Sequence, residues 1–214
     1  MDKETIFITG IDTDAGKSYA TGWLANHIAQ SGRSVMTQKF VQTGNEGRSE
    51  DIELHRRIMH RDIAKEEYDL TAPMIFTYPS SPHLAAKVDG RKVDINTIDA
   101  ARHKLEQRYD TLLVEGAGGL MVPLTDSYLT VDYIVDNHLD LALVTNAKLG
   151  SISHTLLALE AIERRALNLR YLLYNTHFDT DPVIAPETRD YIKHYVAAHF
   201  PTAQWLDIPT ITLP

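Results

Sequence analysis

The chain contains no cysteine, and this absence removes several kinds of chemistry at once. Without thiols there are no disulfide bonds, no thiolate zinc sites and no cysteine nucleophile. The absence fits a reducing compartment, and we expect a cytoplasmic protein. The first five residues lead directly into an apolar run, so we also expect no secretory signal peptide.

Long apolar runs and an excess of basic residues are also missing. No apolar run reaches the length of a membrane span. The 29 acidic residues outnumber the 21 lysines and arginines, which gives a formal net charge of −8. Aromatic residues make up only 8% of the chain and form no tract interleaved with basic residues. These features argue against nucleic acids and anionic membranes as partners.

The chain has instead a regular succession of apolar runs and segments of helical spacing. Its 214 residues suit one domain, residues 1–214, with a single large core. Because the apolar runs are continuous rather than alternating, they favour a mainly parallel sheet with helices on both faces, a doubly wound α/β fold. We expect strands at 6–9, 35–41, 111–115, 141–145, 171–174 and 205–208, helices at 16–30, 94–108, 130–137, 151–165 and 186–199, further helix starts near residues 50 and 82, and an extended segment at 68–80.

The segment that organises the rest of the chain lies near the amino terminus. An apolar run over residues 6–9 enters a glycine-containing loop, and Gly16-Lys17-Ser18 then opens a helical segment. In a phosphate-binding loop, backbone N–H groups surround the phosphates, the lysine reaches the terminal phosphates and the hydroxyl ligates Mg²⁺. Five residues separate Gly10 from Gly16, where the standard motif has four. We therefore predict a nucleotide triphosphate site despite the irregular spacing.

Polar residues follow the other predicted strands as well. Ligands of an open parallel sheet bind beyond the carboxyl ends of its strands. Glu115 ends an apolar strand, as does the carboxylate that holds Mg²⁺ in many nucleotide sites, and Asp51 could supply a second oxygen. Lys39 could stabilise charge on a transferring phosphoryl group. The strand-end set comprises Lys17, Ser18, Lys39, Thr43, Glu115, Lys148 and Asn175.

Two further segments have features of anion sites. Residues 116–119 are Gly-Ala-Gly-Gly, which would let the backbone approach phosphates closely. Ser151 is a candidate N-cap, so the helix start after Lys148 is a second potential anion site. The ten histidines show no zinc-binding spacing, and we expect them to be structural or exposed.

In combination these motifs resemble those of the dethiobiotin synthetases, the ATP-dependent enzymes of biotin synthesis. Residues 10–18 are similar to that family's Gly-Thr-Asp-Thr-x-Val-Gly-Lys-Thr loop, extra residue included. Residues 38–44 resemble its Tyr-Lys-Pro-Val-x-Thr/Ser-Gly. Residues 80–83, 114–119 and 148–150 resemble its Thr/Ser-Ser-Pro-His, Val-Glu-Gly-Ala-Gly-Gly and Lys-Leu-Gly. The departures are Ile11, Ala15 and Phe40, which we expect to alter packing or loop shape more than chemistry.

The resemblance implies a P-loop NTPase type of fold and an unusual carboxylation that uses ATP and Mg²⁺. In that family CO₂ becomes a carbamate on one amine of 7,8-diaminononanoate. The carbamate oxygen attacks the γ-phosphorus of ATP, and the second amine closes the cyclic urea, which gives dethiobiotin, ADP and phosphate. The resemblance also implies a homodimer in which a helix start of one protomer meets the substrate carboxylate bound by the other.

The resemblance also assigns roles to individual residues. Lys17 and Lys39 would be catalytic, and Ser18, Asp51 and Glu115 would bind Mg²⁺. The nucleotide would contact Asp14, Ala15, Gly16, Lys17, Ser18, Tyr19, Asp51, Glu115, Gly116, Ala117, Gly118, Asn175, Thr176, Ile208 and Pro209. The substrate would contact Thr13, Thr43, Ser81, Lys148, Leu149, Gly150 and Ser153.

Two other P-loop functions are alternatives at this point. A cobyrinate-type amidoligase usually carries a glutaminase domain with a cysteine nucleophile, whereas this chain is short and has no cysteine. A partition-type ATPase switch has a signature lysine early in its loop, and that position is Asp12 here. GTPases are disfavoured because no Asn-Lys-x-Asp motif follows the fourth predicted strand.

Overall fold

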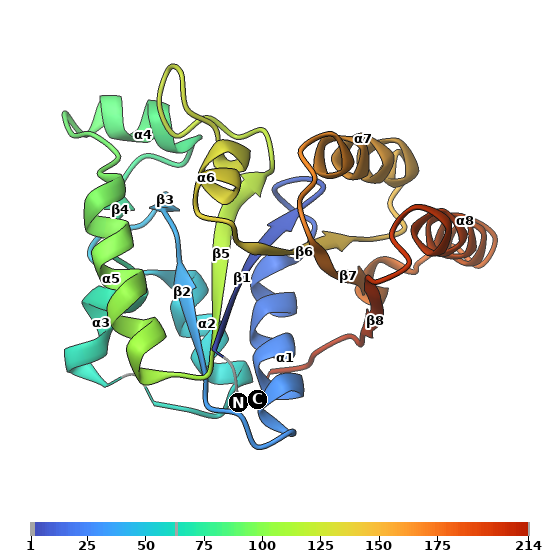
Figure 1. Cartoon of the computed structure of the whole chain (residues 1–214), viewed down its shortest axis with the longest axis horizontal. Helices are drawn as coiled ribbons and strands as arrows, with labels where there is room; N and C mark the ends of the chain where they lie inside the picture. The colour runs from blue at the N-terminus through green and yellow to red at the C-terminus, as the bar shows by residue number, and fades with distance from the viewer. Residues whose placement is uncertain (1–2, 63, 214) are drawn as a thin grey trace.

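The computed structural model, which describes residues 3–62 and 64–213, is built around a six-stranded sheet (Figure 1). The strand order is β2-β5-β1-β6-β7-β8, and all neighbouring strands run parallel. The first strand, β1, is therefore central, with β5 and β2 on one side and β6, β7 and β8 on the other, and ligands bind where the strand order reverses in this way. The bounds are β1 (Glu4–Gly10), β2 (Val35–Lys39), β5 (Thr111–Gly119), β6 (Asp140–Thr145), β7 (Leu169–Asn175) and β8 (Gln204–Ile208).

Helices cover both faces of this sheet. On one face, α1 packs on the strands and α2 packs beside it against β2. The other face carries α4 to α8, whose apolar residues share a core with the opposite side of the same strands. The bounds are α1 (Lys17–Ala29), α2 (Glu50–Ile58), α3 (Lys65–Thr71), α4 (Pro82–Val88), α5 (Ile95–Arg108), α6 (Thr130–Asp136), α7 (Ser151–Arg164), α8 (Ile184–His199) and the 3₁₀ turn η1 (Thr176–Phe178).

The continuous apolar runs follow from this double cover. In β1, Ile6 and Ile8 are buried in the core beneath α1, while Phe7 is buried in the core on the opposite face. Successive side chains of a strand point to opposite faces, so a strand covered on both sides is apolar at every position. The predicted doubly wound α/β class is confirmed.

The structure corrects the prediction in the segment between β2 and α4. The strand expected to reach residue 41 ends at Lys39, and the chain then forms a two-stranded sheet from β3 (Gln42–Thr43) and β4 (Ile75–Phe76). The expected extended segment at 68–80 begins inside α3. Pro73 comes after that helix ends, so the prolines of this segment do not prevent it from forming.

The start of α7 also differs from the expectation. Gly150, with φ 94°, is the N-cap, and Ser151 is the first helical residue. The Ser151 hydroxyl donates instead to Asn146 Oδ1 at 2.6 Å, so it is used to fix the preceding loop. The chain enters the helix through a left-handed conformation that glycine adopts without strain.

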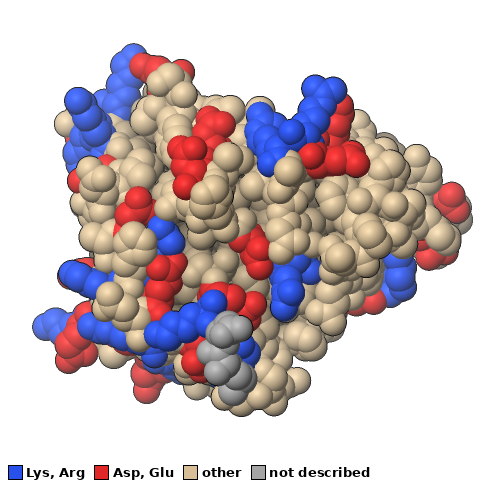
Figure 2. Space-filling view, viewed as in Figure 1, with Lys and Arg blue, Asp and Glu red and all other residues tan. Residues whose placement is uncertain are grey.

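No helix among the described residues is long and apolar enough to cross a membrane. On the face drawn in Figure 2, acidic and basic side chains are interspersed, without a wide patch of one sign. This face therefore has no basic track of the kind that nucleic-acid-binding proteins present.

Candidate active site

A cavity of about 530 Å³ opens at the carboxyl ends of β1, β2 and β5, within the size range of small-molecule sites. Its lining also includes residues of α2, of η1 and of the segment after β8. Most of the predicted ATP and Mg²⁺ residues line it, together with two predicted substrate residues. These are Thr13, Asp14, Gly16, Lys17, Ser18, Tyr19, Lys39, Thr43, Asp51, Glu115, Ala117, Gly118, Asn175 and Pro209.

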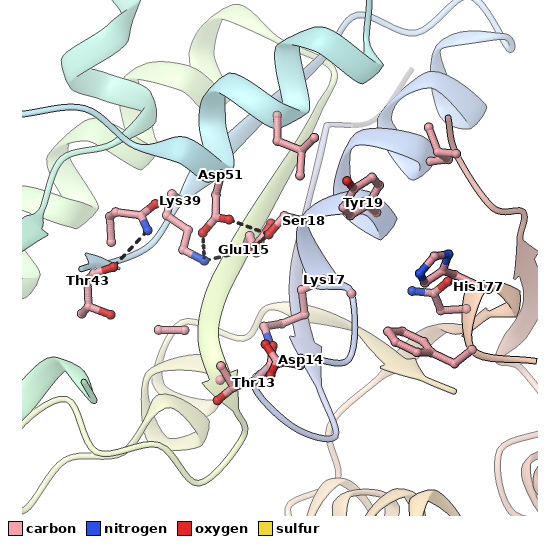
Figure 3. Close-up of a pocket in the computed structure, with 18 of the residues that line it drawn as sticks. Thr13, Asp14, Lys17, Ser18, Tyr19, Lys39, Thr43, Asp51, Glu115 and His177 are labelled. Atoms are coloured by element: carbon pink, nitrogen blue, oxygen red, sulfur yellow. Dashed lines mark hydrogen bonds and ion pairs between the residues drawn. The ribbon is translucent and has the colours of Figure 1, made fainter. Parts of the chain in front are cut away.

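Figure 3 shows that the cavity has two ends. Lys39 and Thr43 lie on one side of Glu115, and Tyr19 and His177 lie on the other. The loop before α1 lies between them and leads into Lys17, the first residue of that helix. An elongated ligand could therefore extend across the loop and contact both ends.

The loop before α1 depends on glycine at position 16. Gly16 has φ 89°, and a Cβ atom there would collide with the side-chain amide nitrogen of Asn175. That nitrogen donates to the carbonyl of Ala15 at 3.3 Å. The end of β7 is thereby joined to the loop, which brings two distant parts of the sequence together at the cavity.

Lys17, the first residue of α1, is buried, and its ammonium group points back to backbone carbonyls of the loop. Its Nζ atom donates to the carbonyl of Asp12 at 2.8 Å and to that of Thr13 at 3.1 Å. Burial, followed by repulsion from Lys39, lowers the pKa of Lys17 to about 8. Because a nearby anion favours the charged form of a lysine, a bound phosphate would be stabilised at this position.

Four polar side chains meet around Glu115 in β5, which does not end at that residue as expected but continues to Gly119. The strand register pairs Lys39 with Glu115, and the Lys39 ammonium lies 2.8 Å from Glu115 Oε1 and 2.6 Å from Asp51 Oδ2. Ser18 Oγ lies 2.7 Å from Asp51 Oδ1 and 2.9 Å from Glu115 Oε1, and can donate to one of them at a time. The dashed lines in Figure 3 join this group.

The charges in this group stabilise one another. Burial would raise the pKa of Glu115, but the Lys39 ammonium and the contact with His55 hold it well below its usual range. Burial would lower the pKa of Lys39, but Glu115 and Asp51 raise it above its ordinary value. Glu115 and Lys39 are therefore both charged at neutral pH.

The oxygens of Ser18, Asp51 and Glu115 form a donor set that suits Mg²⁺. This ion prefers hard oxygen ligands, keeps several waters, and is usually held by one or two carboxylates together with substrate phosphates. Nowhere in residues 3–62 and 64–213 do three or more His, Cys, Asp or Glu side chains gather as a metal site. Two carboxylates and a hydroxyl beside a phosphate-binding loop fit a metal–nucleotide complex better than a metal bound by protein alone.

Comparison with known proteins gives the family. Residues 4–206 match the family model described as an AAA domain. The ATP-dependent dethiobiotin synthetase BioD 2 of Pasteurella multocida (strain Pm70) is 42% identical over 199 residues, which are 92% of this chain and 93% of the relative. The ATP-dependent dethiobiotin synthetase BioD of Chlorobaculum tepidum is 47% identical over 193 residues, or 90% and 81% of the two chains. The chain belongs to the dethiobiotin synthetase family.

Solved structures of more distant proteins share the fold. A ParA family ATPase from Chlorobium tepidum TLS superposes with a TM-score of 0.54 at 17% identity, covering 98% of this chain and 85% of that one. A plasmid partition protein (BB_S35) from Borrelia burgdorferi B31 gives 0.55 at 12%, covering 99% and 88%. At these identities the likeness supports the P-loop NTPase fold and no particular activity.

Some residues that the dethiobiotin synthetase motifs assign to the nucleotide are not among those that line the cavity. The carbonyl of Gly116 accepts from Lys39 Nζ at 3.2 Å. The Thr176 hydroxyl donates to the carbonyl of Ile208 at 2.8 Å, which joins the ends of β7 and β8. Ala15 is buried beneath the loop. These three positions, with Ile208, support the lining residues and are not part of the lining described above.

Most of the predicted substrate residues also lie outside this lining. Lys148 Nζ donates to the carbonyl of Asp14 at 3.0 Å and lies 4.2 Å from the centre of the Phe178 ring. Leu149 is 91% exposed, and Ser153 is exposed at the start of α7. The remaining two are Gly150, the N-cap of α7, and Ser81, whose hydroxyl lies 3.0 Å from His83 Nδ1.

The departures from the family pattern lie in packed surroundings. Phe40 is fully buried, and its ring contacts those of Phe7 and Tyr133 at centroid distances of 5.5 and 4.5 Å. Ile11 is partly buried and packs against both cores. The effect of these departures on packing rather than on chemistry stays a prediction.

Sequence reasoning missed His55, which is fully buried and lies 2.6 Å from Glu115 Oε2 through its Nε2 atom. A signal was present, because His55 follows Asp51 by four residues and so shares its face of α2. His55 lies outside the cavity lining; the lining residues that were missed are Val41, Gln42, Leu54, His177, Phe178 and Ile211.

Proposed function

We propose that this protein synthesises dethiobiotin from 7,8-diaminononanoate, CO₂ and ATP, as one domain of 214 residues working in the cytoplasm. The observation that carries the proposal is the buried cluster beside the P-loop, in which Lys39 is held against Glu115 and Asp51. A lysine additional to the P-loop lysine can stabilise charge on a second reacting group as well as on ATP. Family membership supports the same reaction.

In this proposal the triphosphate of ATP binds along the loop that ends in Lys17. The loop supplies backbone N–H groups and the start of α1, and Lys17 supplies positive charge. The adenine would lie toward the end of the cavity formed by Tyr19, Asn175, His177 and Pro209. Ser18, Asp51 and Glu115 would hold Mg²⁺, which neutralises charge on the phosphates when bound.

The diamine would bind at the opposite end, near Thr13 and Thr43. One amine adds to CO₂ and loses a proton, which gives a carbamate. A carbamate oxygen attacks the γ-phosphorus, and ADP leaves. The second amine then attacks the carbamate carbon, and phosphate leaves as the urea ring closes.

Lys39 would stabilise the negative charge that these steps place on the carbamate and the phosphoryl group. Its ammonium has three N–H groups, which contact Glu115, Asp51 and the carbonyl of Gly116. A substrate oxygen must replace one of these acceptors, and the carbonyl at 3.2 Å is the weakest of the three. Phosphoryl transfer depends mainly on such positioning and charge stabilisation.

We further propose a homodimer in which the α7 start of one protomer meets the substrate carboxylate bound by the other. The exposure of Leu149 and Ser153 supports this, because neither is buried by its own chain. The backbone N–H groups of a helix start suit a carboxylate. Lys148, Gly150 and Ser81 would take part in the same contact or in the nearby substrate site.

The proposal is tested by incubating the purified protein with MgATP, bicarbonate and 7,8-diaminononanoate. We expect dethiobiotin, ADP and phosphate in equal amounts, and no phosphate when the diamine is omitted. ATP turnover that ignores the diamine but responds to another protein would favour a partition-type switch instead.

A further inference from the structure

A buried chain of hydrogen bonds leads from Arg56 through Thr37 and His55 to Glu115. None of these links belongs to the motifs that gave the family resemblance, apart from Glu115 itself. We propose that His55 is a positioning residue that fixes the Glu115 carboxylate so that one of its oxygens faces the metal. This inference rests on the Mg²⁺ role given to Glu115 in the proposed function.

The fold brings these groups together on one side of the sheet. Thr37 and Lys39 are two residues apart in β2 and so point to the same face. Asp51 and His55 are four residues apart in α2 and share one helical face. Glu115 pairs with Lys39 across the strands, so its carboxylate is reached by α2 from one side and by β2 from the other.

The contacts are short and fully buried. His55 Nε2 lies 2.6 Å from Glu115 Oε2, and His55 Nδ1 lies 3.1 Å from Thr37 Oγ1. Arg56 contacts the same threonine twice, with Nη1 at 2.6 Å from Oγ1 and Nη2 at 3.2 Å from the carbonyl. His55 has no exposed surface, and Arg56 is only 4% exposed.

The hydrogen-bonding capacity of each group fixes the direction of the chain. A guanidinium can only donate and an ionised carboxylate can only accept, so Thr37 Oγ1 accepts from Arg56 and His55 Nε2 carries the proton that faces Glu115. Nδ1 of the neutral ring then accepts from the Thr37 hydroxyl. A neutral imidazole that accepts at Nδ1 carries its proton on Nε2, which then donates to Glu115 Oε2. The tautomer is assigned here from this network.

The two carboxylate oxygens of Glu115 therefore have different partners. Oε2 is taken by His55, while Oε1 faces Ser18 and Lys39 on the cavity side. The terminal torsion of a glutamate is soft, so without the His55 bond the carboxylate could rotate. Partners that orient a metal ligand in this way typically change metal affinity or activity by about 10- to 100-fold when removed.

The test compares His55→Leu, which removes the donor, with His55→Gln, whose side-chain amide can supply an N–H donor at a similar distance. ATP binding is measured by calorimetry with Mg²⁺ and with EDTA, and turnover is measured against Mg²⁺ concentration. His194→Leu, the same change at an exposed position of α8, is the control. The variant Thr37→Val keeps the His55 imidazole and removes the hydroxyl that hydrogen-bonds to its Nδ1 atom.

For His55→Leu we expect the half-saturating Mg²⁺ concentration to rise about tenfold or more, with ATP binding in EDTA unchanged. His55→Gln should recover most of the loss, and Thr37→Val should shift the Mg²⁺ dependence in the same direction by less. An unchanged Mg²⁺ dependence in both His55→Leu and Thr37→Val would overturn the inference. Equal losses of ATP binding with and without Mg²⁺, or no recovery in His55→Gln, would also overturn it.

The calorimetric measurement does not require dethiobiotin formation. If the wild-type protein fails to make dethiobiotin, the proposed function is wrong, and the Mg²⁺ dependence of ATP binding still decides the role of His55. If His55→Leu does not fold, the comparison of Thr37→Val with wild type decides it.

Discussion

At the scale of single residues, Lys39 is the group on which the charge balance of the site depends. It is 4% exposed and contacts two carboxylates, one of them fully buried. Removing one partner of a buried ion pair leaves an uncompensated charge, which destabilises a protein far more than losing a surface pair does.

We predict that Lys39→Ala keeps ATP binding but lowers turnover by about 100-fold or more, the scale of losing one preorganised donor at a developing charge. It should also lower the free energy of unfolding by about 3 kcal/mol. Steady-state kinetics, nucleotide titration and denaturant unfolding measure the three quantities, with the exposed lysine variant Lys87→Ala as control. Turnover equal to that of the wild type would remove Lys39 from the catalytic set.

Gly16 is the residue whose backbone shape the nucleotide loop requires. We predict that Gly16→Ala abolishes measurable ATP binding, because the new methyl group collides with Asn175 in addition to straining the backbone. Gly32→Ala is a matched control, since Gly32 has a similar φ of 85° and no atom within 4 Å of the added Cβ. It should lose only about 1 kcal/mol of stability and bind ATP normally. Similar ATP affinity in the two variants would contradict the assigned role of Gly16.

Most residues of the cavity lining could be predicted from the sequence, because they lie near strand ends or in recognisable motifs. The role of His55 could not, because its spacing from Asp51 places it on the same face of α2 but does not show that this face packs against Glu115 in β5. His177, Phe178 and Ile211 reach the cavity only through the way the chain turns after β7 and β8.

At the scale of elements, the strands of the main sheet and most helices were predicted, whereas β3, β4 and α3 were not. The six strands of the main sheet are apolar runs, a signal present in the sequence itself. The strands β3 and β4 are two residues each, and their pairing joins residues more than thirty positions apart. A pairing of that kind leaves no local signature.

The N-cap residue of α5, Asp94, should make the stability of the folded protein depend on pH. Asp94 accepts hydrogen bonds from the Thr97 hydroxyl at 2.7 Å and from the backbone N–H of Asn96 at 3.0 Å. The Thr97 hydroxyl, more than the other bonds, lowers the pKa of Asp94. A lowered pKa in the folded state contributes stability above the unfolded value, and this contribution disappears as the pH falls through the folded value.

We therefore predict that Asp94→Ala lowers the melting temperature at pH 7 and that its difference from wild type narrows as the pH is lowered through the acid range. Asp94→Asn keeps a capping acceptor without a titrating group, so it should melt above Asp94→Ala at pH 7. Thermal unfolding followed by circular dichroism measures both. A deficit in Asp94→Ala that stays constant down to the most acidic pH would contradict this account of the cap.

At the scale of the whole molecule, the proposed substrate contact requires a second copy of the chain. We predict that sedimentation equilibrium gives twice the 24.1 kDa mass of one chain. Leu149→Asp should weaken this association and raise the KM for the diamine, because Leu149 lies at the proposed contact and is 91% exposed. Val183→Asp, at another exposed apolar position, just before α8, is the control. A monomeric wild-type protein with full activity would rule out the shared site.

Dethiobiotin synthesis and ATP hydrolysis by a nucleotide switch differ in the source of one oxygen atom of the released phosphate. If a carbamate oxygen attacks the γ-phosphorus, one oxygen atom of each CO₂ leaves with the phosphate and the other stays in the urea carbonyl. An ATPase that hydrolyses the same bond takes that oxygen from water.

The most direct test supplies ¹⁸O-labelled CO₂ with MgATP and 7,8-diaminononanoate and analyses the phosphate by mass spectrometry before the label exchanges with water. The account predicts one ¹⁸O atom in each phosphate released and one in the carbonyl of each dethiobiotin. Phosphate without ¹⁸O, whose fourth oxygen comes from water, would contradict it.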